Sequence, residues 1–225
     1  MWSPLIPSLI KDGFQCILID LPCHGESRYQ GDKCGMLQMA QTLEAFLKDK
    51  NLSPEFYVGH SMGGYVSLEL NQLRPAKIIL LHSNFWEDNA QKQIDRNRVI
   101  EVVEKNKSLF IKEAIPNLFA PSNKSSCMTS IQELIDEALE IPTKEIQAAT
   151  AGMRDRNSFY KFSKSQSLHI IHGKHDPIIS GDKLRKEISK LNIKHELIEL
   201  ENVGHMSIWE DTGLLIKSLK HIISR

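Results

Sequence analysis

The chain has 225 residues, of which 41% are hydrophobic and 25% are charged, a composition typical of an ordinary globular protein. Lys plus Arg and Asp plus Glu each total 28, so the net charge is zero, and this balance indicates no nucleic-acid partner. No apolar stretch approaches the roughly 20 residues of a membrane-spanning helix. The length suits one domain with an excursion, large enough to bury a sizeable core.

The N-terminal segment Met1–Pro7 has neither a basic leader nor a small-residue cleavage site, so we do not predict a signal peptide. The four cysteines show no paired spacing, and we expect them to be reduced thiols: Cys16, Cys23, Cys34 and Cys127. Both features favour a cytoplasmic protein.

Predicted helices and strands alternate in the first half of the chain. The run over 14–20 is nearly all apolar, as a strand buried on both faces should be. We predict helices over 5–11, 36–48 and 62–73, and strands over 14–20, 55–60 and 77–83. This alternation predicts a mostly parallel sheet flanked by helices.

The alternation stops between about Asn84 and Tyr160, where three helical patterns follow one another with no strand between them. Their apolar stripes cover 94–103, 131–138 and 146–153. We interpret residues 85–160 as a helical cap over the active edge of the sheet, because lids are how such sites exclude water. The alternative is a group of extra helices packed on one flank.

Strands and helices resume after the predicted cap. We expect strands over 168–172 and 195–200, and helices over 180–191 and 206–223. Residues 1–84 and 161–225 are therefore predicted to form one α/β core.

The most informative stretch is Gly59-His60-Ser61-Met62-Gly63, between a predicted strand and a predicted helix. Gly-x-Ser-x-Gly in this position is the nucleophile-elbow pattern, in which a sharp turn exposes the serine hydroxyl. The following helix would place the Met62 amide and a positive dipole end where an oxyanion forms. Taken alone, a capping serine in a glycine-rich turn explains the pattern equally well.

Two later residues supply what a serine nucleophile needs, namely a base and a group that orients the base. Asp176 lies just beyond a buried strand and precedes Pro177, which places its carboxylate at the carboxyl edge of the sheet. His205 lies in a glycine-led turn after the last predicted strand, at the same edge.

Four segments match the patterns of one known family: Asp20-Leu21-Pro22-x-His24-Gly25-x-Ser27, Gly59-His60-Ser61-Met62-Gly63-Gly64, Gly173-x-x-Asp176 and Gly204-His205. With them the chain resembles the α/β-hydrolase superfamily, and within it the small capped single-domain esterases. The chain order of serine, aspartate and histidine is also that of this superfamily.

The resemblance implies that Ser61 is the nucleophile, His205 the general base and Asp176 the orienting acid. Some members take the acid after the preceding strand, where this chain has Ser83 and Asn84, and this favours Asp176. A serine at the elbow argues against the epoxide-hydrolase and haloalkane-dehalogenase branches, which carry aspartate there.

One strand of the family pattern has no counterpart in this sequence. In relatives the segment that resembles Trp2–Leu5 closely follows a His-Gly loop, whose amide is the second oxyanion donor. The absent strand would lie between those predicted over 14–20 and 55–60. We expect either a truncated hydrolase or a direct closure of these two strands, and the second donor stays open.

No metal or cofactor is implied. His169, His172 and His175 are spaced three apart, and positions three apart on a strand point to opposite faces, so we predict no metal site. Several residues are candidates to line a substrate pocket, with packing inside the protein as an equal alternative for each. They are His60, Phe85, Trp86, Phe119 and Met153.

We therefore predict hydrolysis of a small or medium carboxylic ester through an acyl-enzyme on Ser61. A C–C bond hydrolase or an elimination enzyme with the same triad is an alternative, which Arg154 or Arg156 in the pocket would favour. A non-catalytic binding protein of the same fold is another. The expected partner is a small-molecule ester, with no nucleic acid and no membrane span, and the chain is expected to be a monomer or a homodimer.

Overall fold

The computed structural model describes residues 1–162 and 166–224. Its sheet consists of β1 (Phe56–His60), β2 (Lys77–Leu81), β3 (Ser167–Gly173) and β4 (Lys194–Leu200). All pairs are parallel and the spatial order is β1-β2-β3-β4. The carboxyl ends of the strands therefore meet at one edge, so the residues that follow each strand can form a common site.

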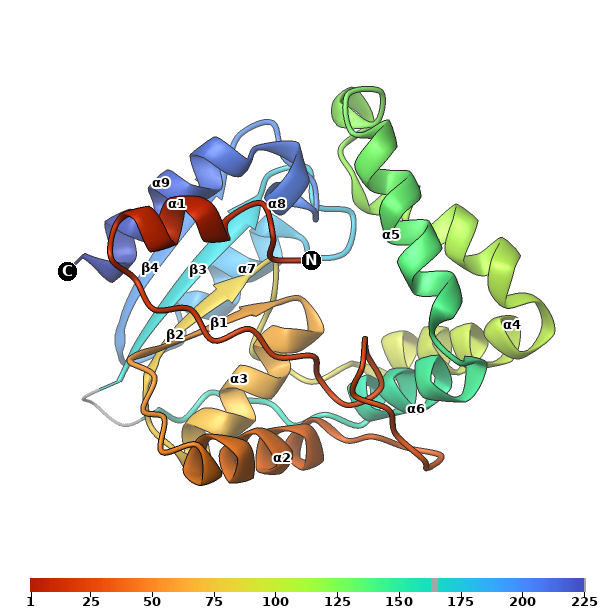
Figure 1. Cartoon of the computed structure of the whole chain (residues 1–225), viewed down its shortest axis with the longest axis horizontal. Coiled ribbons are helices and arrows are strands. Elements are labelled where there is room, and N and C mark those ends of the chain that lie inside the picture. The colour runs from red at the N-terminus through yellow and green to blue at the C-terminus, as the bar shows by residue number, and fades with distance from the viewer. Residues whose placement is uncertain (163–165, 225) are drawn as a thin grey trace.

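Helices cover both faces of this sheet (Figure 1). Alternate residues of a strand point to opposite faces. Ile79 and Leu81 accordingly pack in the same apolar cluster as α1 (Ile6–Lys11) and α9 (Thr212–Ile223). Ile78 and Leu80 instead pack with α3 (Met62–Leu73) and α7 (Gly181–Ile188).

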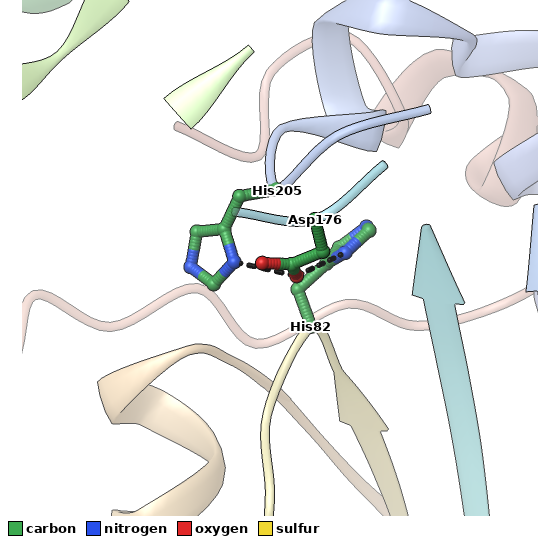
Figure 2. Close-up of side chains that lie close together, drawn as sticks. All are labelled: His82, Asp176 and His205. Atoms are coloured by element: carbon green, nitrogen blue, oxygen red, sulfur yellow. Dashed lines mark hydrogen bonds and ion pairs between the residues drawn. The ribbon is translucent and has the colours of Figure 1, made fainter. Parts of the chain in front are cut away.

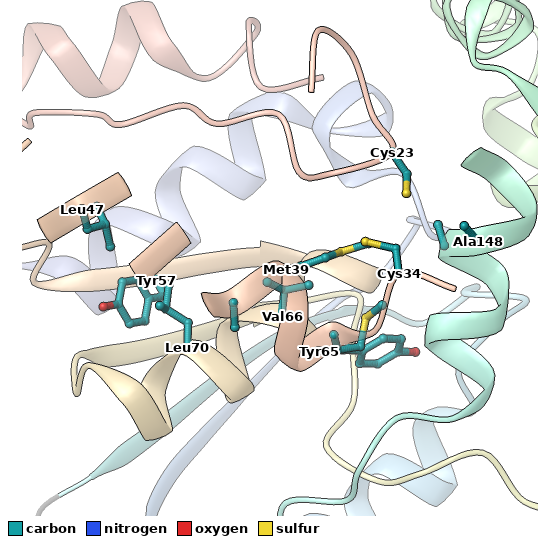
Figure 3. Packing of buried hydrophobic residues seen from close by; sticks show 12 residues of the cluster. Cys23, Cys34, Met39, Leu47, Tyr57, Tyr65, Val66, Leu70 and Ala148 are labelled. Atoms are coloured by element: carbon teal, nitrogen blue, oxygen red, sulfur yellow. The ribbon is translucent and has the colours of Figure 1, made fainter. Parts of the chain in front are cut away.

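A second layer lies outside α3, where α2 (Met36–Asp49) packs against it (Figure 3). Met39 from α2 and Val66 from α3 are buried in this cluster, together with the unpaired thiols of Cys23 and Cys34. Ala148 belongs to the same cluster, so the loop before α2 also contacts a helix from the middle of the chain.

That middle part is a helical insertion between β2 and β3, which we define as residues 90–154. It comprises α4 (Ala90–Ala114), two 3-10 turns η1 (Pro116–Leu118) and η2 (Pro121–Asn123), α5 (Met128–Glu140) and α6 (Thr143–Arg154). In Figure 1 its helices stand beside the sheet rather than on either face. The three predicted helical stripes thus fall on α4, α5 and α6. No helix in the described ranges is long and apolar enough to span a membrane.

The strand predicted over 14–20 is wrong. These residues form an irregular segment without strand pairing, and Ile17 and Leu18 are 40% and 55% exposed. An apolar run becomes a strand only where a neighbouring strand completes the ladder. In the described part of the chain β1 pairs with β2 alone, so its other edge offers no such ladder to this segment.

The closing helix predicted over 206–223 is in fact two helices. α8 (Ser207–Glu210) ends before Asp211, whose side chain accepts a hydrogen bond of 2.8 Å from the Leu214 amide. Asp211 is therefore the N-cap of α9, a position that aspartate strongly favours.

Candidate active site

Ser61 lies at the turn between β1 and α3 with φ 49° and ψ −115°, in the left-handed region that non-glycine residues rarely adopt. Neighbouring groups hold this strained conformation. The Ser61 amide donates to the Leu81 carbonyl (2.9 Å), and the Ser83 hydroxyl donates to the Ser61 carbonyl (2.7 Å). A Cβ at Gly59 would overlap the backbone of Gly63, so glycine is required there.

The Ser61 side chain is free for chemistry. It precedes α3 at the N-cap position yet makes no capping hydrogen bond, which removes the simple capping explanation of the Gly-x-Ser-x-Gly pattern. Among the residues that the structure describes, nothing else engages its hydroxyl. Met62 is the first residue of α3, and the first amides of a helix have no partner within the helix.

Asp176 follows β3 and is held through both oxygens, and Figure 2 shows its contacts with His205 and His82. Its Oδ1 accepts the amides of Ile178 (2.8 Å) and Ile179 (3.0 Å). Its Oδ2 accepts Nδ1–H of His205 (2.8 Å) and lies 3.3 Å from Nδ1 of His82. Burial by itself raises the pKa of Asp176, but the hydrogen bonds from the two imidazoles outweigh it and hold the pKa well below its usual range.

His205 follows β4 in a turn that the helical insertion supports. Its amide donates to the Leu118 carbonyl (2.8 Å), and its carbonyl accepts Nε2–H of His60 (2.8 Å). A Cβ at Gly204 would lie 2.5 Å from the Ala120 amide nitrogen. The backbone of residues 118–120, from the end of η1 to the residue before η2, therefore packs directly on the turn that presents His205.

The Glu210 carboxylate joins the same two segments. It accepts the amides of Gly204 (2.9 Å), Met206 (2.9 Å) and Ala120 (2.8 Å), and Nδ2 of Asn123 (2.9 Å). Sequence reasoning missed this residue, although its place five positions after His205 in the first turn of a helix could have indicated it.

Sequence reasoning also missed His82, the first residue after β2. With His60, His172 and His205 it forms a buried group, in which neighbouring ring centroids lie 5.0 to 6.2 Å apart. Burial lowers the pKa of His60 and His172, and it lowers the pKa of His82 to about 4. These rings are therefore neutral near pH 7. The signal in the sequence was a histidine at the carboxyl end of a buried strand.

His82, Asp176 and His205 also offer ligand atoms that all lie within 4.8 Å of one another. The short His205–Asp176 contact is a hydrogen bond, and a metal ion would have to displace that proton. The absence of a metal site stays a prediction. His169, one of the spaced histidines, lies 3.4 Å from Glu196 rather than near this group.

The candidate pocket residues are dispersed. Phe85 and Trp86 pack in the core with α7, whereas Phe119 packs with residues of the insertion. Met153 packs against the apolar cluster between α2 and α3 that contains Cys23 and Cys34. The His60 side chain instead hydrogen-bonds to the His205 carbonyl. A polar cleft of about 620 Å³ lies beside Asp176. It is lined by Lys174, Asp176, Ile179, Ser180, Gly181, Asp182, Arg185 and Glu199.

Arg154 and Arg156, the two arginines whose presence in the pocket would favour the alternative reactions, are each paired with an aspartate. Arg156 Nη1 lies 2.7 Å from Asp88 Oδ1, and its guanidinium lies 4.1 Å from the centroid of the Tyr65 ring. Arg154 Nε lies 2.7 Å from Asp155 Oδ1.

Comparison with known proteins gives a consistent result for the fold. Residues 1–95 match a family model described as alpha/beta hydrolase fold. A thermophilic esterase from Thermogutta terrifontis superposes with a TM-score of 0.85 at 23% identity, covering 99% of this chain and 84% of that chain. An esterase from Exiguobacterium antarcticum gives 0.86 at 16% identity, covering 100% and 87%.

The enol-lactonase from Burkholderia xenovorans also gives a TM-score of 0.86, at 14% identity, covering 100% of this chain and 86% of that chain. A curated relative is the dihydrolipoyllysine-residue acetyltransferase component of the acetoin cleaving system of Pseudomonas putida. It is 27% identical over 198 residues, which are 84% of this chain and 51% of that protein, so the chain spans about half its length.

Proposed function

We propose that this chain, a member of the α/β-hydrolase superfamily, is a serine hydrolase that cleaves small or medium carboxylic esters through an acyl-enzyme on Ser61. One observation carries the proposal. The carboxylate of Asp176 orients His205 through a hydrogen bond of 2.8 Å, at the sheet edge where the strained elbow presents an unengaged serine hydroxyl. The esterases among the structural neighbours agree with this chemistry.

The proposed groups then act in sequence. Nε2 of His205 takes the proton of the Ser61 hydroxyl as the serine oxygen attacks the ester carbonyl, and the Met62 amide donates to the oxyanion. The intermediate collapses, and His205 protonates the departing alcohol. Water then loses a proton to His205 and attacks the acyl group, and that proton returns to Ser61. Asp176 stays ionised throughout and stabilises the imidazolium.

We assign residues 85–160 as the cap of this enzyme and residues 1–84 and 161–225 as its core. The hydrogen bond from the His205 amide to the Leu118 carbonyl supports the assignment, because Leu118 belongs to the insertion and His205 is the proposed general base. The pairing of Arg154 and Arg156 with aspartates favours a neutral ester over the carboxylate substrates of the elimination and C–C bond alternatives.

The test is the intact mass of the protein after exposure to a fluorophosphonate, followed by a panel of p-nitrophenyl esters. We expect a single adduct on the parent and none on Ser61→Ala. Ser67→Ala is the matched control, because Ser67 lies in the same helix and donates to Gly63; it should label like the parent. No adduct on a folded parent, or equal labelling of Ser61→Ala, would refute the proposed nucleophile. Tight ligand binding without turnover would instead support a binding protein.

A further inference from the structure

We propose that His82 is a positioning residue for the catalytic acid, donating its Nδ1–H to the same Asp176 oxygen that His205 uses. The carboxylate would thus be shared by two imidazoles, one that exchanges protons with substrate and one that does not. The role of His205 in this inference rests on the proposed function. The pairing of His82 with Asp176 can be measured independently of it.

The position of His82 is fixed on every side. It follows β2 with φ 46°, a conformation that costs free energy for a β-carbon-bearing residue. Its side chain is fully buried. Nδ1 lies 3.3 Å from Asp176 Oδ2, and Nε2 lies 2.7 Å from the hydroxyl of Ser207. Ser207 is itself fully buried.

These contacts select one tautomer. With the proton on Nε2, the Nδ1 lone pair would face a buried carboxylate at 3.3 Å and the two would repel each other. With the proton on Nδ1, the ring donates to Asp176 while Nε2 accepts the Ser207 hydroxyl proton. The Gly173 amide directs its N–H at Nδ1, at 3.3 Å, and would donate to it in the other tautomer. It offers a weaker partner than an ionised carboxylate, because charged acceptors form the stronger hydrogen bonds.

The shared oxygen gives His82 an influence on His205. Two amides hold Oδ1 of Asp176, so the second imidazole on Oδ2 fixes the remaining rotation of the carboxylate. The N–H of His82 also partly offsets the negative charge of the Asp176 carboxylate, and so weakens the attraction of that carboxylate for the His205 imidazole. Removing His82 therefore leaves a less restrained carboxylate that attracts the His205 proton more strongly.

Other titratable groups face the same carboxylate. His172 Nδ1 lies 3.7 Å from Asp176 Oδ2, and the His60 ring lies 5.0 Å from that of His205. The cleft beside Asp176 adds a set of charged residues, namely Lys174, Asp182, Arg185 and Glu199. All of these groups are retained in the variants below, so a change in pH dependence reports on His82.

The test compares His82→Leu with His82→Asn. Asparagine can place an amide N–H near the position of Nδ1, whereas leucine fills the space without a donor. His169→Asn is the matched control, because His169 is a buried strand histidine that contacts Glu196 rather than Asp176. Each variant is measured for ester kcat and KM between pH 5 and 9, and for histidine ring protons and tautomers by ¹H and ¹⁵N NMR.

We expect the parent to show two downfield Nδ1–H signals, one from His205 and one from His82. His82→Leu should lose one signal and reduce kcat about 10- to 100-fold with little change in KM. The acidic side of its rate–pH profile should move upward by about half to one pH unit. His82→Asn should restore most of kcat and the parental profile, and His169→Asn should leave both unchanged.

Two results would overturn the proposal: a parental rate–pH profile in His82→Leu, or equal losses in the Leu and Asn variants. An Nε2–H tautomer for His82 would also overturn it, even if the protein turns over no ester. If His82→Leu does not fold, Ser207→Ala decides, because it removes only the hydroxyl that holds Nε2. A downfield Nδ1–H signal of His82 that persists there supports the proposal, because Asp176 still accepts this proton, and a shift of the ring to the Nε2–H tautomer refutes it.

Discussion

Replacing Glu210 should disconnect the His205 turn from the helical insertion. The carboxylate accepts the amides of Gly204, Met206 and Ala120, and all three of these residues are buried. A buried donor left without an acceptor costs about 1–3 kcal/mol. Summing this cost over the three donors gives an upper limit, because water entry and relaxation of the backbone reduce the actual cost. Glu210→Ala should therefore lower the free energy of unfolding by about 3–5 kcal/mol.

Glu210→Gln keeps one carbonyl oxygen as an acceptor, so this variant should lose about half as much free energy of unfolding as Glu210→Ala. The assay is urea unfolding followed by tryptophan fluorescence, with ester kcat measured on the folded fraction. Glu201→Ala is the control, because Glu201 is an exposed carboxylate in an ion pair with Lys174 and should cost less than about 1 kcal/mol. A loss below about 1 kcal/mol in Glu210→Ala, with unchanged kcat, would refute the network described here.

Three further predictions concern the elbow and the acid. Gly59→Ala should abolish fluorophosphonate labelling, since its Cβ would overlap the Gly63 backbone; labelling at the parental rate would contradict this. Ser83→Ala removes the donor to the Ser61 carbonyl and should lower kcat about tenfold, the equivalent of roughly 1.4 kcal/mol. The free energy of unfolding, measured between pH 4 and 7, should depend on His82, whose pKa falls from 6.5 to about 4 on folding. The unfolded chain binds that proton more tightly, so stability is complete above pH 6.5 and falls by about 3 kcal/mol toward pH 4.

The controls for these predictions come from the same chain. Ser53→Ala removes an exposed hydroxyl that accepts a hydrogen bond from Arg74 and should leave kcat unchanged, in contrast to Ser83→Ala. His82→Asn should flatten the slope of stability between pH 4 and 6.5. Asp176 contributes with the same sign but in a lower pH window, because its depressed pKa adds stability that is lost only below about pH 4, where the unfolded carboxyl protonates. A slope that is equally steep in the parent and in His82→Asn would contradict the assignment to His82.

The sequence was sufficient to predict what depends on local pattern and strand order. Parallel strands bring their carboxyl ends together, so the positions of Asp176 and His205 after two predicted strands predicted their approach, and the structure has them hydrogen-bonded. The three helices of the insertion followed from their apolar periodicity. The strained elbow followed from glycines that flank Ser61.

What the sequence could not supply depends on contacts between distant segments. The apolar run over 14–20 has the composition of a strand, but pairing requires a neighbour, and composition does not report on one. His82 was overlooked because a lone buried histidine is usually structural, and only the approach of Asp176 gives it a chemical role. Glu210 acts through Ala120, which lies 90 residues away in a segment without regular periodicity.

The support of His205 by Leu118 has a consequence for exchanging parts between related proteins. Helical insertions are natural units to swap when a new specificity is sought, and α4, α5 and α6 could be replaced as such a unit. The segment from Pro116 to Asn123 could not be replaced with them, because its backbone holds the turn that carries the general base. A chimaera should therefore keep this short segment from the protein that donates the core, even though it lies in the middle of the insertion.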